Sequence, residues 1–166
     1  MVSPRIALSL VLVCAACVAG CRQPDGASPA VEGDVPNRIA DLGRNLENIA
    51  SGDPAGAQDL AADLKVFVPT KPGAATPIDD LSRMVAQGLS GRRLETEASQ
   101  ALAHQLWLTV SGQDFSEKQA ESLQADVRDA ALAAGVAPEV AGALATQAAA
   151  VQRAVTDRQR RWYEVF

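Results

Sequence analysis

Apolar residues recur at helical spacing through most of the chain beyond residue 33. Ile39, Leu42, Leu46 and Ile49 follow one another at intervals of three or four residues, the pattern of a helix with one buried face. Five later segments show the same spacing, and each is bounded by glycine, proline or a residue that commonly caps helices. The pattern therefore predicts six helices, which begin near Asp34, Asp53, Thr76, Leu94, Ser116 and Pro138.

The fifth of these helices has the clearest start. Ser116 and Gln119 have the spacing of a capping box, in which each side chain bonds the backbone N–H of the other residue. Phe115 is placed to pack on Ala120, which would fix the direction in which the chain enters the helix.

The earlier helices have simpler end patterns. Asp34 is a candidate N-cap for the first helix, and Asp53 is followed by Pro54, a residue favoured at the first helical position. Thr76 precedes Asp79 by three residues, which allows a capping-box-like exchange. Gly91 follows the third helix, where a left-handed C-terminal glycine is expected.

Two connections between predicted helices have similar sequences. Residues 89–94 (LSGRRL) and 110–115 (VSGQDF) match at an offset of 21, and in both a helix ends on Ser-Gly before an apolar residue opens the next. Short connections of this kind make consecutive helices antiparallel neighbours. We therefore expect residues 34–166 to form a single all-α domain of about six helices in antiparallel hairpins, arranged as a small bundle or a stacked-hairpin array.

The first 20 residues have the organisation of an export signal. Arg5 precedes the apolar run 6–18, which is shorter than the roughly 20 residues a transmembrane helix needs, and small residues follow it. The sequence 18–21, Val-Ala-Gly-Cys, resembles the lipobox of bacterial lipoprotein signal peptides. The resemblance implies removal of residues 1–20 and acylation of Cys21 on its sulfur and its new amine. An ordinary cleaved signal or an uncleaved anchor is the alternative interpretation.

The acylated cysteine would be followed by a flexible tether. Two or three acyl chains exceed what stable anchoring requires, and Arg22 in the next position favours the outer membrane, facing the periplasm, by the sorting pattern of enteric bacteria. Residues 21–33 are rich in Pro and Gly and contain almost no large apolar side chain. As a flexible coil, the 12 residues after Cys21 would span roughly 20 Å.

Cysteine usage and net charge exclude several functions. Cys14 and Cys17 lie inside the apolar signal run, so their Cys-x-x-Cys spacing does not indicate a redox or metal site. Removal of residues 1–20 leaves 146 residues with 14 Lys and Arg against 20 Asp and Glu, a net charge of −6. This acidic balance argues against nucleic acid as a partner and against flat adsorption of the domain onto anionic lipid.

No constellation of residues indicates catalysis or a cofactor. His104 is the only histidine, whereas a zinc or haem site needs several convergent ligands and a Ser-His-Asp site needs a nucleophile that the sequence does not nominate. Carboxylate pairs such as Asp59/Asp63 and Glu117/Glu121 lie in or near first helical turns, where acidic residues complement the helix dipole. We therefore expect neither enzyme activity nor a bound metal or cofactor.

Two features are candidates for binding a partner. Trp107 falls almost opposite the apolar stripe of the fourth helix, so it either packs under another helix or is an exposed aromatic of the kind enriched at binding hot spots. The C-terminal cluster either complements a helix dipole or recognises an acidic partner or an anionic envelope polymer. The residues of this cluster are Arg153, Arg158, Arg160, Arg161, Trp162 and Tyr163.

Together these features favour a membrane-anchored envelope lipoprotein without enzyme activity. The first hypothesis is an adaptor or scaffold that binds another envelope protein through its helical surface. The alternative is a carrier or inhibitor that holds a small or peptidic ligand between its helical hairpins, which an apolar cleft with a few polar groups would favour.

Overall fold

The computed structural model describes residues 34–68, 75–113 and 115–163, with the side chains of 157–163 left undescribed. These residues form α1 (Val35–Ala50), α2 (Gly56–Val66), α3 (Ala75–Leu89), α4 (Thr96–Val110), α5 (Glu117–Ala133) and α6 (Pro138–Tyr163). The described part of the chain contains no strand, so the expected all-α fold is confirmed. None of the helices described is both long and apolar enough to cross a membrane.

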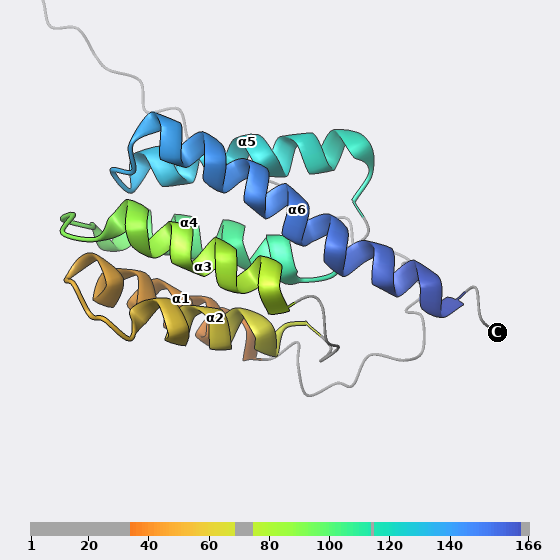
Figure 1. The fold of residues 1–166 in the computed structure, drawn as a ribbon, viewed down its shortest axis with the longest axis horizontal. Helices are drawn as coiled ribbons and strands as arrows, with labels where there is room; N and C mark the ends of the chain where they lie inside the picture. Colours follow the sequence, from red (N-terminus) through yellow and green to blue (C-terminus); the bar gives the residue numbers. More distant parts are fainter. Residues whose placement is uncertain (1–33, 69–74, 114, 164–166) are drawn as a thin grey trace, which may run out of the picture.

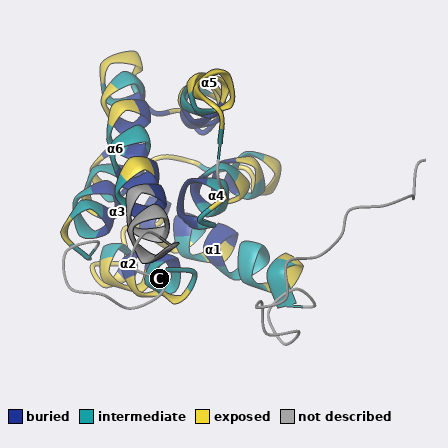
Figure 2. Ribbon diagram, turned by 90° about the vertical axis from the view of Figure 1, so that its right-hand side faces the viewer, coloured by how far each residue is buried: buried dark blue, intermediate teal, exposed yellow. Residues whose placement is uncertain are grey.

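The six helices are stacked in three tiers. Figure 1 shows α1 with α2 in the lowest tier, α3 with α4 in the middle and α5 with α6 above them. The view along the helices shows two columns, one of α2, α3 and α6 and the other of α1, α4 and α5 (Figure 2). Successive helices alternate in direction, so the N-terminus of α1 and the C-termini of α2, α4 and α6 lie at one end, called the terminal end below.

The two helices of the middle tier do not approach each other closely. No Cα atom of α3 lies within 8 Å of a Cα atom of α4, in contrast to every other pair of consecutive helices. Val85 and Leu89 of α3 and Leu102 and Leu106 of α4 are nevertheless at most 1% exposed and belong to one core cluster. The apolar stripes that predicted the helices therefore meet in a single continuous core.

The two Ser-Gly connections share the backbone conformation of their glycine. α3 ends at Leu89 and α4 at Val110, each directly before its Ser-Gly pair. Gly91 and Gly112 both have a φ of 70°, in the left-handed region that glycine enters at little cost. The sequence repeat thus corresponds to a left-handed glycine directly after each of the two helices.

The start of α2 differs from the prediction. The helix begins at Gly56, because the Asp53 carboxylate accepts a hydrogen bond from the N–H of Ala55 (2.9 Å) and the Asp53 carbonyl accepts one from the N–H of Gly56 (3.2 Å). These bonds make a turn before the helix. Gly56 then packs directly on α1, since a Cβ at this position would lie 2.6 Å from the Cγ1 of Ile49.

The start of α5 follows the predicted capping box. The hydroxyl of Ser116 accepts from the N–H of Gln119 (3.4 Å), and the Gln119 side-chain oxygen accepts from the N–H of Ser116 (3.0 Å). Phe115 packs against the core beside this turn. The arrangement fixes both the first turn of α5 and the path of the chain that enters it.

Ser116→Ala is expected to lower the free energy of unfolding by about 1 kcal/mol, because it leaves an N–H of the first turn without its side-chain acceptor. Urea denaturation followed by circular dichroism measures the change. Ser116→Asp keeps an acceptor at the N-cap and should stay close to the wild type. Equal losses in the two variants would contradict a capping role for this side chain.

A candidate interaction surface at the terminal end

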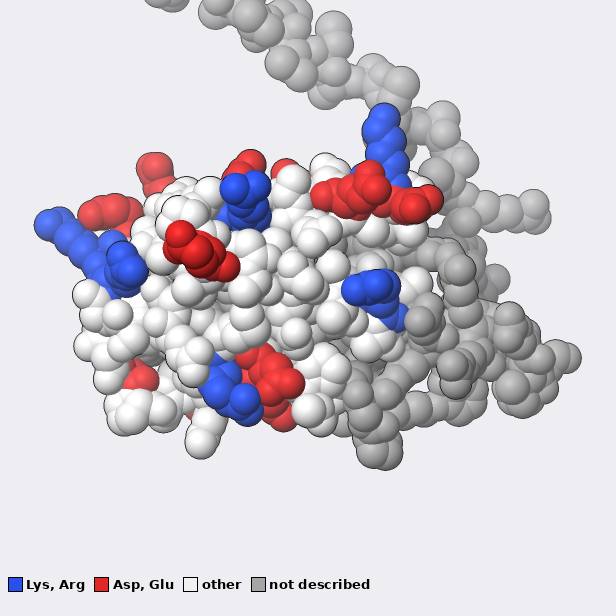
Figure 3. Space-filling view, turned by 45° about the horizontal axis from the view of Figure 1, so that its top comes forward, with Lys and Arg blue, Asp and Glu red and all other residues white. Residues whose placement is uncertain are grey.

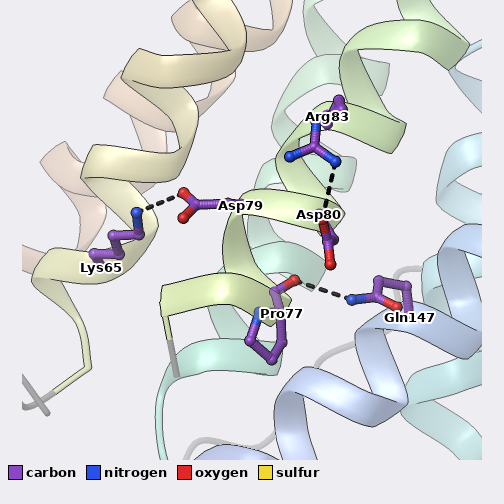
Figure 4. Close-up of polar contacts among 6 residues, drawn as sticks. All are labelled: Lys65, Pro77, Asp79, Asp80, Arg83 and Gln147. Carbon is purple, nitrogen blue, oxygen red and sulfur yellow. Dashed lines mark hydrogen bonds and ion pairs between the residues drawn. The ribbon is translucent and has the colours of Figure 1, made fainter. Parts of the chain in front are cut away.

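Polar bonds join three helices at the terminal end. Lys65 in the last turn of α2 donates to the Asp79 carboxylate of α3 at 2.5 Å, and the Gln147 amide of α6 donates to the carbonyl of Pro77 at 3.0 Å (Figure 4). Asp80 accepts from Arg83 within α3. Asp79, considered in the sequence for a capping-box-like exchange with Thr76, thus bonds a side chain of the neighbouring helix.

α6 extends well beyond its neighbours at this end. The bond from Gln147 places that residue level with the start of α3, and sixteen more residues follow to Tyr163, about 24 Å at the helical rise. Val151 and Val155 are still buried, and α6 continues for seven residues past Thr156, about 10 Å. Figure 1 shows the C-terminal part of α6 projecting past the other five helices.

A polar pair lies within the buried stripe of α6. Gln152 and Thr156 are 6% and 8% exposed, and the Gln152 amide donates to the Thr156 hydroxyl at 3.0 Å. The Thr156 hydroxyl in turn donates to the Gln152 carbonyl at 3.0 Å. These two bonds lie within α6, and no described residue of another element is hydrogen-bonded to the pair.

A pocket of about 230 Å³ lies between the start of α1 and the end of α2. Arg38 forms an ion pair with Asp34 at 2.9 Å, and its guanidinium lies 5.8 Å from the centre of the Phe67 ring. Asp63 accepts from Asn45 at 2.6 Å. The full lining is Asp34, Arg38, Asp41, Asp63, Val66 and Phe67.

Sequence reasoning did not single out this pocket, because its residues become neighbours only when α1 packs on α2. Val66 is 60% exposed, the most accessible large apolar side chain described. Within the described residues, no group of three or more His, Cys, Asp or Glu has an arrangement suited to a metal ion.

Trp107 lies near the C-terminal end of α4. It is half-buried and packs against the core, while His104, one turn earlier, is exposed. The two rings are tilted by 34°, with centroids 5.8 Å apart. The two placements considered from the sequence are therefore combined in part: Trp107 packs on its neighbours and keeps some accessible surface.

The remaining candidate residues can be placed only in part. The backbone of α6 carries Arg158, Arg160, Arg161 and Trp162 to the terminal end, but their side chains lie outside the described part of the structure. Arg153 is exposed and donates to the carbonyl of Ala149 at 3.2 Å. Cys21 and the predicted tether precede the described residues. The terminal end thus brings together Trp107, the end of α6 and the start of α1.

The face formed by α5 and α6 has a different character. Acidic and basic side chains are interspersed over it, with uncharged surface between them (Figure 3). A groove of about 450 Å³ runs between the two helices. It is lined by Glu121, Gln124, Ala125, Arg128, Pro138, Glu139, Gly142 and Ala145. This lining contains none of the large apolar side chains expected of the ligand-carrier alternative.

Comparison of the chain with protein-family models, with curated proteins and with solved structures found no match.

Proposed function

We propose that the protein is a lipid-anchored adaptor of the bacterial cell envelope, without enzyme activity, that binds another envelope protein through the surface around Trp107. The lipobox-like sequence ending at Cys21 supports the anchor, in the outer membrane facing the periplasm. The helical domain supplies a rigid body on which a binding surface can be held.

The observation that carries this proposal is the pairing of the half-buried Trp107 with the exposed His104. Trp107 is held by the core on one side and accessible on the other, so it loses little conformational freedom when a partner covers it. Tryptophan in such a position is a residue type enriched among binding hot spots. The exposed His104 ring beside it adds aromatic and hydrogen-bonding surface.

Site-specific photo-crosslinking in intact cells tests the proposal. A photoreactive residue at His104 should yield one adduct of defined mass, whereas the same residue at Asp126, an exposed position on α5, should not. Trp107→Ala should lower the yield from position 104 about tenfold or more, because loss of a hot spot costs about 2 kcal/mol or more of binding free energy.

Leu132→Ala is the matched control, since Leu132 is also half-buried and packed against the core but lies on α5. It should leave the adduct from position 104 unchanged. Two results would contradict a binding surface at Trp107. One is the same adduct from positions 104 and 126, and the other is an equal loss of adduct yield from position 104 in Trp107→Ala and Leu132→Ala.

A further inference from the structure

The chain enters and leaves the bundle at the same end. α1 begins at the terminal end, and the C-terminal part of α6 projects from that end (Figure 1). Twelve residues separate Cys21 from Asp34, and as a flexible coil they would span roughly 20 Å. α6 reaches about 24 Å beyond the level of Pro77. The tether and the projecting helix are therefore of comparable reach.

Charge is divided between the body of the bundle and this projection. Residues 34–152 contain nine Lys and Arg against sixteen Asp and Glu, a net charge of −7. Residues 153–163 contain four Arg against one Asp, a net charge of +3, and end in Trp162 and Tyr163. Arginine is attracted to anionic headgroups, and Trp and Tyr are the residues enriched at the membrane–water interface.

Two acidic residues at the terminal end, one at the start of α1 and one on α3, are already paired. Asp34 is bonded to Arg38 at 2.9 Å and Asp79 to Lys65 at 2.5 Å. These ion pairs reduce the repulsion that the terminal end would meet at an anionic surface. An anionic membrane surface repels the acidic sides of the bundle. The protein is therefore expected to approach the membrane with its terminal end first and not with one of its sides.

We propose that residues Arg158–Tyr163 of α6 contact the anionic phospholipid surface of the membrane that holds Cys21. This inference rests on the lipid anchor of the proposed function and adds a second, non-covalent contact. The acyl chains hold the protein at the membrane, and the tip of α6 sets its orientation. An end-on bundle keeps the side of α4 that carries His104 free to meet a neighbouring protein.

Quenching of tryptophan fluorescence by brominated phospholipids tests this contact. The full-length lipidated protein is purified, the acylation of Cys21 is checked by mass, and the protein is reconstituted into vesicles of phosphatidylcholine with or without phosphatidylglycerol. We expect quenching that requires phosphatidylglycerol, is lost in Trp162→Phe and weakens at high salt. Arg158/Arg160/Arg161→Gln should abolish it, since three arginines at an anionic surface raise occupancy roughly a hundredfold.

Arg92/Arg93/Arg128→Gln is the matched control. It removes the same charge from exposed positions on the α3–α4 connection and on α5, and it should leave the quenching of Trp162 unchanged. Unacylated Cys21 would overturn the anchor of the proposed function and, with it, this inference. Two results would overturn this inference and leave the lipid anchor intact: no phosphatidylglycerol-dependent quenching in the acylated protein, or equal quenching in both triple variants. An acidic protein would then be the expected partner of residues Arg158–Tyr163.

Discussion

Leu106→Ala is expected to lower the free energy of unfolding by about 3–5 kcal/mol, the upper part of the range for large-to-small changes in a core. Leu106 is fully buried in α4 and belongs to the cluster that joins α4 to the other helices. That cluster also includes side chains of α1, α2, α3, α5 and α6, so several helices pack around the site of the substitution. A cavity there cannot be closed by a small shift of one helix.

Urea denaturation of the wild type and the variant measures this loss directly. Val66→Ala is the control at an exposed position, where the change should stay within about 0.5 kcal/mol. Leu106→Met keeps most of the volume and should cost less than about 1.5 kcal/mol. A loss below about 1 kcal/mol in Leu106→Ala would mean that the middle tier can collapse around the missing side chain.

The helices themselves could be predicted because their apolar residues recur with the period of a helix. Of the apolar stripe that predicted α1, Leu42, Leu46 and Ile49 are at most 3% exposed, and Ile39 packs against the core. The ends of helices were predictable where one residue fixes the backbone, as Gly135 does with a φ of 81°. The start of α2 could not be predicted in this way, because the hydrogen bond from the N–H of Ala55 to the Asp53 carboxylate competes with the capping role that the position of Asp53 suggests.

The packing of the helices could not be predicted, because it depends on which apolar stripes fit one another. Nothing in the sequence indicates that α1 packs beside α4 or that α3 and α4 stand apart. Gly43 leaves room for the side chain of Gln100 on α4, whose amide nitrogen lies 2.3 Å from where a Cβ would be. Such a role is visible only when both helices are in place.

The candidate surface was predictable in part. The sequence predicted a last helix that begins near Pro138, and the alternation of six helices places its C-terminal part at the end of the bundle where α1 begins. Trp107 could be singled out by its position opposite the apolar stripe, but its half-buried state depends on the helices beside α4. The contact of Arg38 with Phe67 joins two helices and has no counterpart in local sequence.

Ser82→Ala is expected to raise the free energy of unfolding by about 1–2 kcal/mol. The Ser82 hydroxyl is buried, 1% exposed as a residue, and has no hydrogen-bond partner among the described residues. A buried polar group without a partner costs about 1–3 kcal/mol, and alanine is also the better helix former. Both effects act in the same direction, so removal of the hydroxyl should stabilise the protein.

Ser99→Ala, the same substitution at another buried serine, is expected to change the free energy of unfolding in the opposite direction. Ser99 is also buried in a helix, but its hydroxyl lies 2.8 Å from the Glu47 carboxylate of α1 and 2.8 Å from the carbonyl of Thr96. Loss of a hydrogen bond to a charged group outweighs the gain in helix propensity, so we expect a loss of about 1–2 kcal/mol. The two variants compared by urea denaturation should therefore differ in sign. A stability change of the same sign in both would mean that hydrogen bonding of these serines does not govern their contribution, since burial and helix propensity are matched between them.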